Sequence, residues 1–236
     1  MPNSAHFWLA LAEIVWINLL LSGDNAVVIA LACRGLPPAQ RRWGIVLGTL
    51  PAVLLRVLFT LCIGSLLALP FLKILGAALL LWIAVGLIQP DAGPDTARLT
   101  NRRHSLWVAV RTIVVADAVM SLDNVVAIAA AAAGDMVLLV AGLLLSMPMI
   151  IFGSGLILGL LERWPLLVTA GAGLLGWIAG DMLLSDPVLP DWAERHRQVL
   201  ETVLPALGAA LVVATGHLWA AQRRRVAAVQ ADGGEA

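Results

Sequence analysis

Seven long apolar stretches, separated by short segments rich in Pro, Gly and polar residues, run along the chain. They cover residues 7–32, 43–69, 71–89, 105–133, 136–161, 165–184 and 199–221. A helix that crosses a bilayer needs about 20 mainly apolar residues. The stretches lack the alternation of apolar and polar positions that is typical of a membrane β-strand. The pattern therefore predicts an all-α, polytopic membrane protein with seven transmembrane helices.

Composition and charge support this fold class. The 236 residues are 61% hydrophobic and 13% charged, with a mean hydropathy of +0.93. An average soluble domain is about 45–50% apolar and about 25% charged, so a soluble enzyme, a nucleic-acid-binding protein and a disordered protein are excluded. Fifteen basic residues balance fifteen acidic ones, which gives no reason to expect a nucleic acid as partner. Two cysteines, Cys33 and Cys62, indicate neither a disulfide framework nor a metal cluster.

Basic residues between the stretches predict the orientation of the chain in the membrane. If the N-terminus lies outside, the cytoplasmic segments carry ten arginines, whereas the outer segments carry only Lys73, Arg195 and Arg197. Because Lys and Arg are enriched on the cytoplasmic side, we expect the N-terminus outside and the C-terminus inside. We expect residues 1–222 to form a single transmembrane domain and residues 223–236 to form a disordered cytoplasmic tail.

An internal repeat relates the first six stretches. Residues 22–27, SGDNAV, match residues 121–126, SLDNVV, at an offset of 99. Pro51 matches Pro148 in the next stretch of each half, and Gly76 matches Gly171 in the third. Each repeat holds three stretches, an odd number, so the second copy enters the membrane from the opposite side. The chain is thus predicted to contain two inverted three-helix repeats, 7–89 and 105–184, and one extra helix, 199–221. Inverted repeats are common in secondary transporters, whose binding site lies near the midplane.

Ionisable and amide side chains lie inside the predicted spans. A charged group at bilayer depth costs several kcal/mol, and such groups usually line a pathway or pair with one another. The carboxylates are Glu13, Asp24, Asp117, Asp123 and Asp181, the arginines are Arg56 and Arg111, and the amides are Asn18, Asn25 and Asn124. Because the copies are inverted, the two Asp-Asn pairs are expected to flank a cavity at the midplane. Residues 22–25 contain few good helix formers, so the first helix is expected to unwind there and free carbonyl oxygens.

These side chains offer only oxygen ligands, which suit Mg²⁺, Ca²⁺ or Mn²⁺. Two aspartates that meet repel each other unless a dication or a shared proton relieves them, which also indicates exchange of a metal for protons. We therefore expect a metal site at Asp24, Asn25, Asp123, Asn124 and Asp117. Glu13, Asn18 and Asp181 are candidates for a proton path or a vestibule, and Arg56 and Arg111 for counter-charges.

Several of these assignments have alternatives. Asp117 can be a ligand, a proton carrier or the partner of Arg111, and Asp181 can serve a gate, a vestibule or a plain interface. Arg56 has no counterpart in the second repeat, where Gly153 lies opposite, so a structural counter-charge to one aspartate is favoured. Asp24 and Asp123 can themselves be structural partners of arginines.

At the paired motifs the sequence resembles the TerC family of integral membrane proteins, in particular its short YjbE-like branch, within the LysE-type transporter superfamily. Residues 72–76, LKILG, and 81–84, LWIA, support the resemblance, which covers residues 7–221. It implies a bacterial inner-membrane protein that exports Mn²⁺, with a link to tellurium resistance. It also implies that Asp24, Asn25, Asp123 and Asn124 lie at the metal pathway.

The sequence thus favours an exporter of a divalent cation, Mn²⁺ in the first place, driven by proton antiport. An exporter of an amino acid or another small solute is the first alternative. The second is a membrane scaffold that protects against tellurium or envelope stress without transport. No nucleophile elbow, zinc-protease signature or phosphate loop occurs, so neither an enzyme nor a bound cofactor is expected. The expected partners are the transported cation and the lipid bilayer, and the oligomeric state is left open.

Overall fold

A computed structural model describes residues 4–62, 69–88, 105–132, 135–189 and 195–232, and within them the chain is helical apart from short turns. The helices and their bounds are α1 (Ser4–Leu20), α2 (Gly23–Cys33), α3 (Pro38–Leu61), α5 (Leu72–Leu87), α7 (Leu106–Ala132), α8 (Met136–Arg163), α9 (Leu166–Leu183) and α11 (Arg197–Asp232). The all-α class predicted from the sequence is confirmed. The predicted ends of the second and third stretches, 63–68 and 89, lie outside the described residues.

The first apolar stretch forms two helices instead of one. α1 ends at Leu20, α2 begins at Gly23, and the two axes differ in direction by 49°. Ser and Gly are poor helix formers, and the N-terminus of α2 has no side-chain cap from Ser22. The interruption expected at this motif is therefore present. The matching motif in α7 has Leu122 in place of Gly23, and α7 runs through it unbroken.

Several helices are long and apolar enough to cross a membrane. Four in the described residues meet this test, and the bent pair α1 and α2 makes a fifth if it counts as one span. The four are Pro38–Leu61, Met136–Arg163, Leu166–Leu183 and Arg197–Trp219. α5 is apolar but has only 16 residues, about 24 Å at 1.5 Å per residue. The protein is thus multi-pass, and the full set of seven spans stays a prediction.

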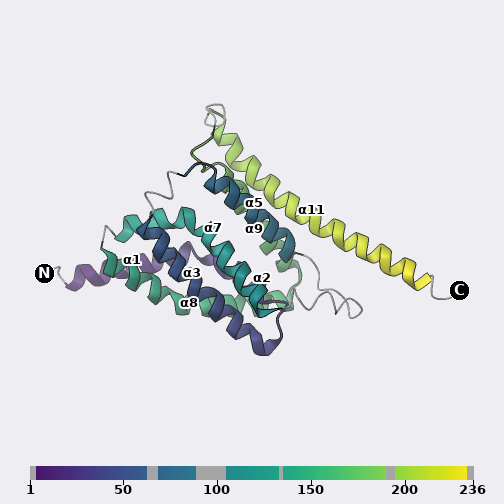
Figure 1. The fold of residues 1–236 in the computed structure, drawn as a ribbon, viewed down its shortest axis with the longest axis horizontal. Helices are drawn as coiled ribbons and strands as arrows, with labels where there is room; N and C mark the ends of the chain where they lie inside the picture. The colour runs from purple at the N-terminus through teal and green to yellow at the C-terminus, as the bar shows by residue number, and fades with distance from the viewer. Residues whose placement is uncertain (1–3, 63–68, 89–104, 133–134, 190–194, 233–236) are drawn as a thin grey trace.

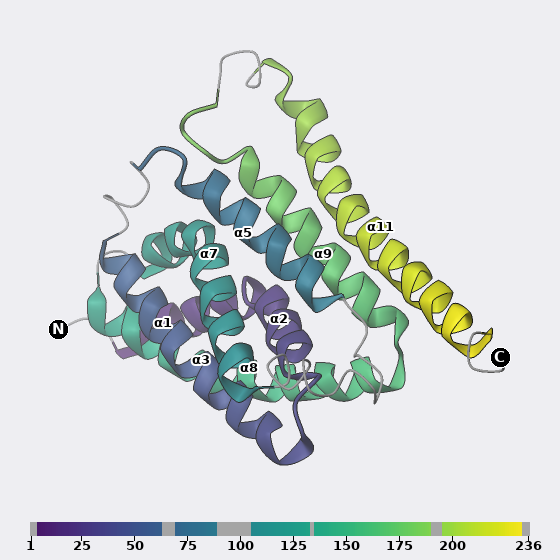
Figure 2. The same cartoon turned by 45° about the vertical axis from the view of Figure 1, so that its right-hand side comes forward.

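The helices form two neighbouring groups (Figures 1 and 2). α1, α2, α3, α7 and α8 pack together, and α5, α9 and α11 lie side by side along them, with α11 at the outer edge. α5 and α9 contact the first group through α7, α2 and α8. The intramembrane polar residues are therefore held mainly between α1, α2, α3 and α7.

The contacts between the two repeats are reciprocal. α1 and α2 pack on α8, as their equivalent α7 packs on α3, and α5 packs on its own equivalent, α9. Ile14 and Ile113 are 99 residues apart, and each sits against a glycine of the other half. A Cβ at Gly142 would lie 2.4 Å from Ile14, and one at Gly48 would lie 2.6 Å from Ile113. This packing agrees with a duplicated fold, whereas the inverted orientation of the copies stays a prediction.

The predicted disordered tail is helical over most of its length. α11 continues through the basic residues 223–225 to Asp232, and 233–236 lie outside the described residues. Residues 220–231 consist of Ala, Gln, Arg and Val, and all except Val are good helix formers. Helix propensity accounts for the extension of α11 over 223–232, which polarity alone did not predict, and the expected disorder of the tail stays a prediction.

α9 and α11 approach each other through facing glycines. A Cβ at Gly208 would lie 2.1 Å from the carbonyl oxygen of Gly176, and one at Gly176 would lie 2.4 Å from the carbonyl oxygen of Gly208. Such closeness is typical of small residues at membrane helix interfaces. Only glycine fits at either position without a shift of the backbone.

We expect Gly208→Ala to lower the thermal stability of the detergent-solubilised protein, because the new methyl group forces α9 and α11 apart at a cost of about 1–3 kcal/mol. Gly153→Ala in α8 is the matched control, since nothing lies within 4 Å of a Cβ there, and its Tm should be unchanged or slightly raised. Equal Tm values for the two variants in a thermal denaturation assay would contradict this packing.

Candidate functional site

A buried arginine lies at the centre of the polar residues. Arg56 on α3 is 1% exposed, and its guanidinium donates hydrogen bonds to both repeats. Nη1 donates to Asn18 Oδ1 at 2.8 Å and to Ser22 Oγ at 2.9 Å. Nη2 pairs with Asp117 Oδ1 at 2.8 Å, and Nε donates to Ser121 Oγ at 3.0 Å. The charge of Arg56 is thus balanced by one carboxylate and solvated by three further side-chain oxygens.

The groups that bind Arg56 are related by the internal repeat. Asn18 matches Asp117, and Ser22 matches Ser121, each at the offset of 99. In both halves the serine hydroxyl donates to the side chain one turn earlier, at 3.4 Å in the first and 3.2 Å in the second. Arg56 therefore joins equivalent positions of the two copies.

Arg56 has the role of counter-charge expected from the sequence, and its partner is Asp117. The alternative in which Asp117 pairs with Arg111 is wrong. Arg111 is exposed on α7, whereas the Asp117 side chain is buried beside Arg56. Asn18, expected at a proton path or vestibule, is buried in this cluster and also donates from its amide to Ser146 on α8.

The asparagines of the two motifs have different surroundings. Asn124 Nδ2 donates to the carbonyl oxygen of Leu21 at 3.0 Å, an oxygen at the break between α1 and α2. The position that matches Leu21 is Met120, which lies inside the unbroken α7. Asn25 accordingly lacks the matching bond: it is 2% exposed, and neither polar atom of its side chain has a hydrogen-bond partner.

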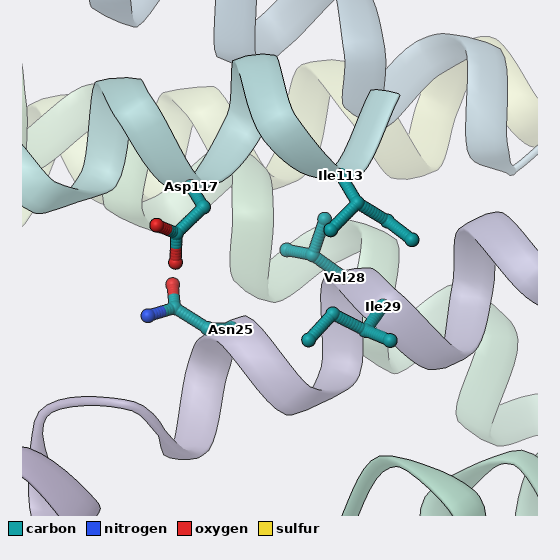
Figure 3. A pocket seen from close by; sticks show the side chains of 5 residues that line it. All are labelled: Asn25, Val28, Ile29, Ile113 and Asp117. Carbon is teal, nitrogen blue, oxygen red and sulfur yellow. The ribbon is translucent and has the colours of Figure 1, made fainter. Parts of the chain in front are cut away.

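Asn25 faces Asp117 across a narrow cleft. Val28, Ile29 and Ile113 complete its walls, and it is too narrow for a water molecule in this conformation. Figure 3 shows the carboxamide of Asn25 directed at the carboxylate of Asp117, with the three apolar side chains to one side. A buried amide without a partner costs free energy, and here it stands next to a carboxylate that also lacks its full set of donors.

Asp24 lies beside this cleft on the first turn of α2. Its side chain is partly buried, and Oδ1 accepts a hydrogen bond from the backbone N–H of Asn25 at 2.8 Å. Arg56 and Asp117 both act on it electrostatically. The N-terminal end of a helix favours a negative charge. Asp24 therefore lies next to Asn25 along the chain and within electrostatic reach of the pair of Arg56 and Asp117.

Asp123 belongs to a different cluster. Its carboxylate forms an ion pair with the ammonium of Lys73, at the start of α5. The Lys73 side chain is 14% exposed and the Asp123 side chain 37% exposed. Asp181 is exposed near the end of α9, and Asp123 and Lys73 both act on it electrostatically. Sequence reasoning gave Lys73 no part in the site, because its partner is 50 residues away.

Asp186 fixes the start of α5 and was also missed. Its carboxylate accepts from the backbone N–H groups of Phe71, Lys73 and Ile74 at 3.1–3.2 Å and of Val188 at 3.0 Å. Burial opposes the charge, but these four donors together hold the pKa of Asp186 below its ordinary value. Phe71, in a left-handed conformation with φ of 63°, precedes the helix. Asp186 thus positions the backbone of Lys73, and the Asp-Pro pair at 186–187 was the only sequence signal.

The predicted site residues do not form a single metal centre in this conformation. Within the described residues no three His, Cys, Asp or Glu side chains are placed to hold one metal ion together. Asp24, Asn25 and Asp117 gather at one place, and Asp123 and Asp181 at another. Glu13 is exposed on α1. Each of the two clusters contains a basic side chain that already neutralises one carboxylate.

The chain belongs to the TerC family of integral membrane proteins, whose family model matches residues 3–225. It is similar to the "uncharacterized membrane protein YjbE" of Bacillus subtilis, with 45% identity over 88% of this chain and 93% of that protein. It is also similar to the "UPF0053 inner membrane protein YgdQ" of Escherichia coli K12, with 26% identity over 70% of this chain and 74% of that protein. No solved structure gives a significant match.

We expect Arg56→Met to destabilise the protein by about 3–5 kcal/mol, because it leaves the carboxylate of Asp117 buried without its counter-charge. The double variant Arg56→Met/Asp117→Asn should recover much of this loss, which a double-mutant cycle of thermal or denaturant unfolding measures. Arg111→Gln is the control. Arg111 is exposed on α7, so this substitution should have little effect on stability. If Arg56→Met is as stable as Arg111→Gln, the central role of Arg56 is wrong.

Proposed function

We propose that this TerC-family protein exports a divalent metal cation, with Mn²⁺ as its substrate, by proton antiport across the bacterial inner membrane. One observation carries the proposal: the buried, unpartnered amide of Asn25 is directed at the carboxylate of Asp117, with Asp24 beside them. An amide oxygen that has no donor, together with two carboxylates, is suited to bind a cation.

The chemistry of this group favours a hard divalent ion. The group offers carboxylate and amide oxygens and no sulfur or imidazole, a set that suits Mg²⁺, Ca²⁺ or Mn²⁺. Asp24 and Asp117 carry two negative charges against the single positive charge of Arg56, so a cation entering the cleft meets a net negative site. The narrowness of the cleft favours a bare ion over an amino acid. The resemblance to the TerC family favours Mn²⁺ among the three ions.

The two clusters suggest a path from one face of the membrane to the other. If the N-terminus lies outside, α2 carries Asp24 toward the cytoplasm and α7 carries Asp123 toward the exterior. Asp117, paired with Arg56, acts electrostatically on Asp24 and precedes Asp123 on the same helix, α7. A cation would therefore pass from Asp24 and Asp117 to Asp123. The ion pairs of Asp117 and Asp123 close this path in the present conformation, as alternating access requires at one stage of the cycle.

Proton antiport supplies the driving force. Moving two positive charges outward against a potential that is negative inside costs about 4.6 kcal/mol per 100 mV, at about 2.3 kcal/mol per charge. Two protons that enter in exchange offset this charge completely. Asp117 and Asp123 are neutralised by Arg56 and Lys73, whereas Asp24 forms no ion pair within the described residues. Asp24 is therefore the carboxylate of the path that is available to take up a proton after Mn²⁺ leaves.

We expect Asp24→Asn and Asp123→Asn each to reduce Mn²⁺ export by at least tenfold, because each removes a charged ligand from one end of the path. The measurement is Mn²⁺ uptake into inside-out proteoliposomes under an imposed proton gradient. Glu162→Gln is the matched control: Glu162 pairs with Arg41 at the end of α8, away from both clusters, and its transport should equal that of the wild type. If both aspartate variants fold and transport Mn²⁺ at the wild-type rate, neither carboxylate belongs to the transport path and the proposal is wrong.

A further inference from the structure

The carboxylate of Asp123 forms an ion pair with the ammonium of Lys73. A metal ion that binds this carboxylate has to break the ion pair. Asp123 is held by a single ammonium group, and its carboxylate is 37% exposed, so a second cation can approach it from the open side. Lys73 is anchored through its backbone by Asp186, and its side chain, 14% exposed, reaches Asp123 over a stem with four rotatable bonds. The geometry is that of a positive charge on a flexible tether.

The choice of residue is informative. Of the fifteen Lys and Arg residues in the chain, fourteen are arginines, and Lys73 is the only lysine. Arginine at position 56 forms four hydrogen bonds with a rigid, planar group and is built to stay in place. Lysine presents a compact point charge on a flexible stem. Arg56 therefore holds its carboxylate in a fixed network, while Lys73 holds Asp123 by one replaceable contact.

We propose that the ammonium of Lys73 is a tethered counter-cation, which neutralises Asp123 in the absence of metal and is displaced when a divalent cation binds that carboxylate. The inference rests on the proposed function, since it describes how one carboxylate of the path accepts its substrate. Displacement keeps Asp123 neutralised at every stage, so the chain avoids the cost of an unpaired carboxylate in the membrane.

The surroundings offer the displaced lysine a second partner. Asp181 lies on α9, which packs on α5, and Lys73 and Asp123 both act on it electrostatically. A metal bound at Asp123 would repel the ammonium, and the exposed carboxylate of Asp181 would receive it. The ammonium of Lys73 thus has two positions, one at Asp123 and one near Asp181. It takes the second position when a divalent cation is bound at Asp123.

The single lysine allows a direct test on the unmodified protein. We expect saturating Mn²⁺ to raise the rate at which a water-soluble succinimidyl ester labels Lys73 by at least threefold, measured by mass spectrometry of the solubilised protein at fixed pH. NaCl at matched ionic strength should give a smaller rise, and Asp123→Asn should label fast with or without Mn²⁺. An unchanged or lower labelling rate in wild-type protein that has bound Mn²⁺ would overturn the displacement.

A substitution gives an independent readout. Lys73→Met keeps the length of the side chain and removes the competing charge, so we expect roughly fivefold tighter Mn²⁺ binding by calorimetry, as for a partly exposed ion pair. Lys73→Arg keeps the charge and should bind Mn²⁺ no more tightly than the wild type. Unchanged affinity in folded Lys73→Met would overturn the inference while leaving the proposed function intact. A wild-type protein that binds no Mn²⁺ at all would overturn both.

Discussion

The burial of one guanidinium group constrains the centre of this protein. Arg56 is always charged, and a membrane interior offers it no water, so the protein must supply oxygens for its N–H groups. Asp117 supplies the opposite charge, and Asn18, Ser22 and Ser121 supply the remaining acceptors. These oxygens come from both repeats. The ends of α1 and α2, the middle of α3 and the middle of α7 are therefore held together by one residue.

The two copies of the Asp-Asn motif have different surroundings, because the helix breaks at one copy and not at the other. Gly23 lets the first copy break, which exposes the carbonyl of Leu21 and gives Asn124 its partner. The second copy stays helical at Leu122, so Asn25 has no such carbonyl and remains unpartnered next to Asp117. The copy that carries the glycine breaks and the other does not, which accompanies one satisfied amide and one amide without a partner.

The sequence predicted what depends on local pattern and could not predict what depends on distant contacts. The apolar stretches indicated the helices, and the poor helix formers at 22–25 indicated the break between α1 and α2. Arg56 was expected to balance an aspartate, but its partner is chosen by the packing of α3 on α7, which no pattern along the chain encodes. The same holds for Lys73 and Asp123, and for the four donors of Asp186, which come together only through tertiary structure.

The central claim is that Asn25 and Asp117, beside Arg56, form the place where the transported cation binds. Anomalous X-ray scattering at the manganese edge, from crystals of the wild-type protein grown with Mn²⁺, tests it most directly. The account predicts an anomalous peak within coordination distance, about 2.0–2.6 Å, of the side-chain oxygens of Asn25 and Asp117. A well-ordered structure in which manganese occupies only surface positions, while the amide of Asn25 remains unliganded, would contradict it.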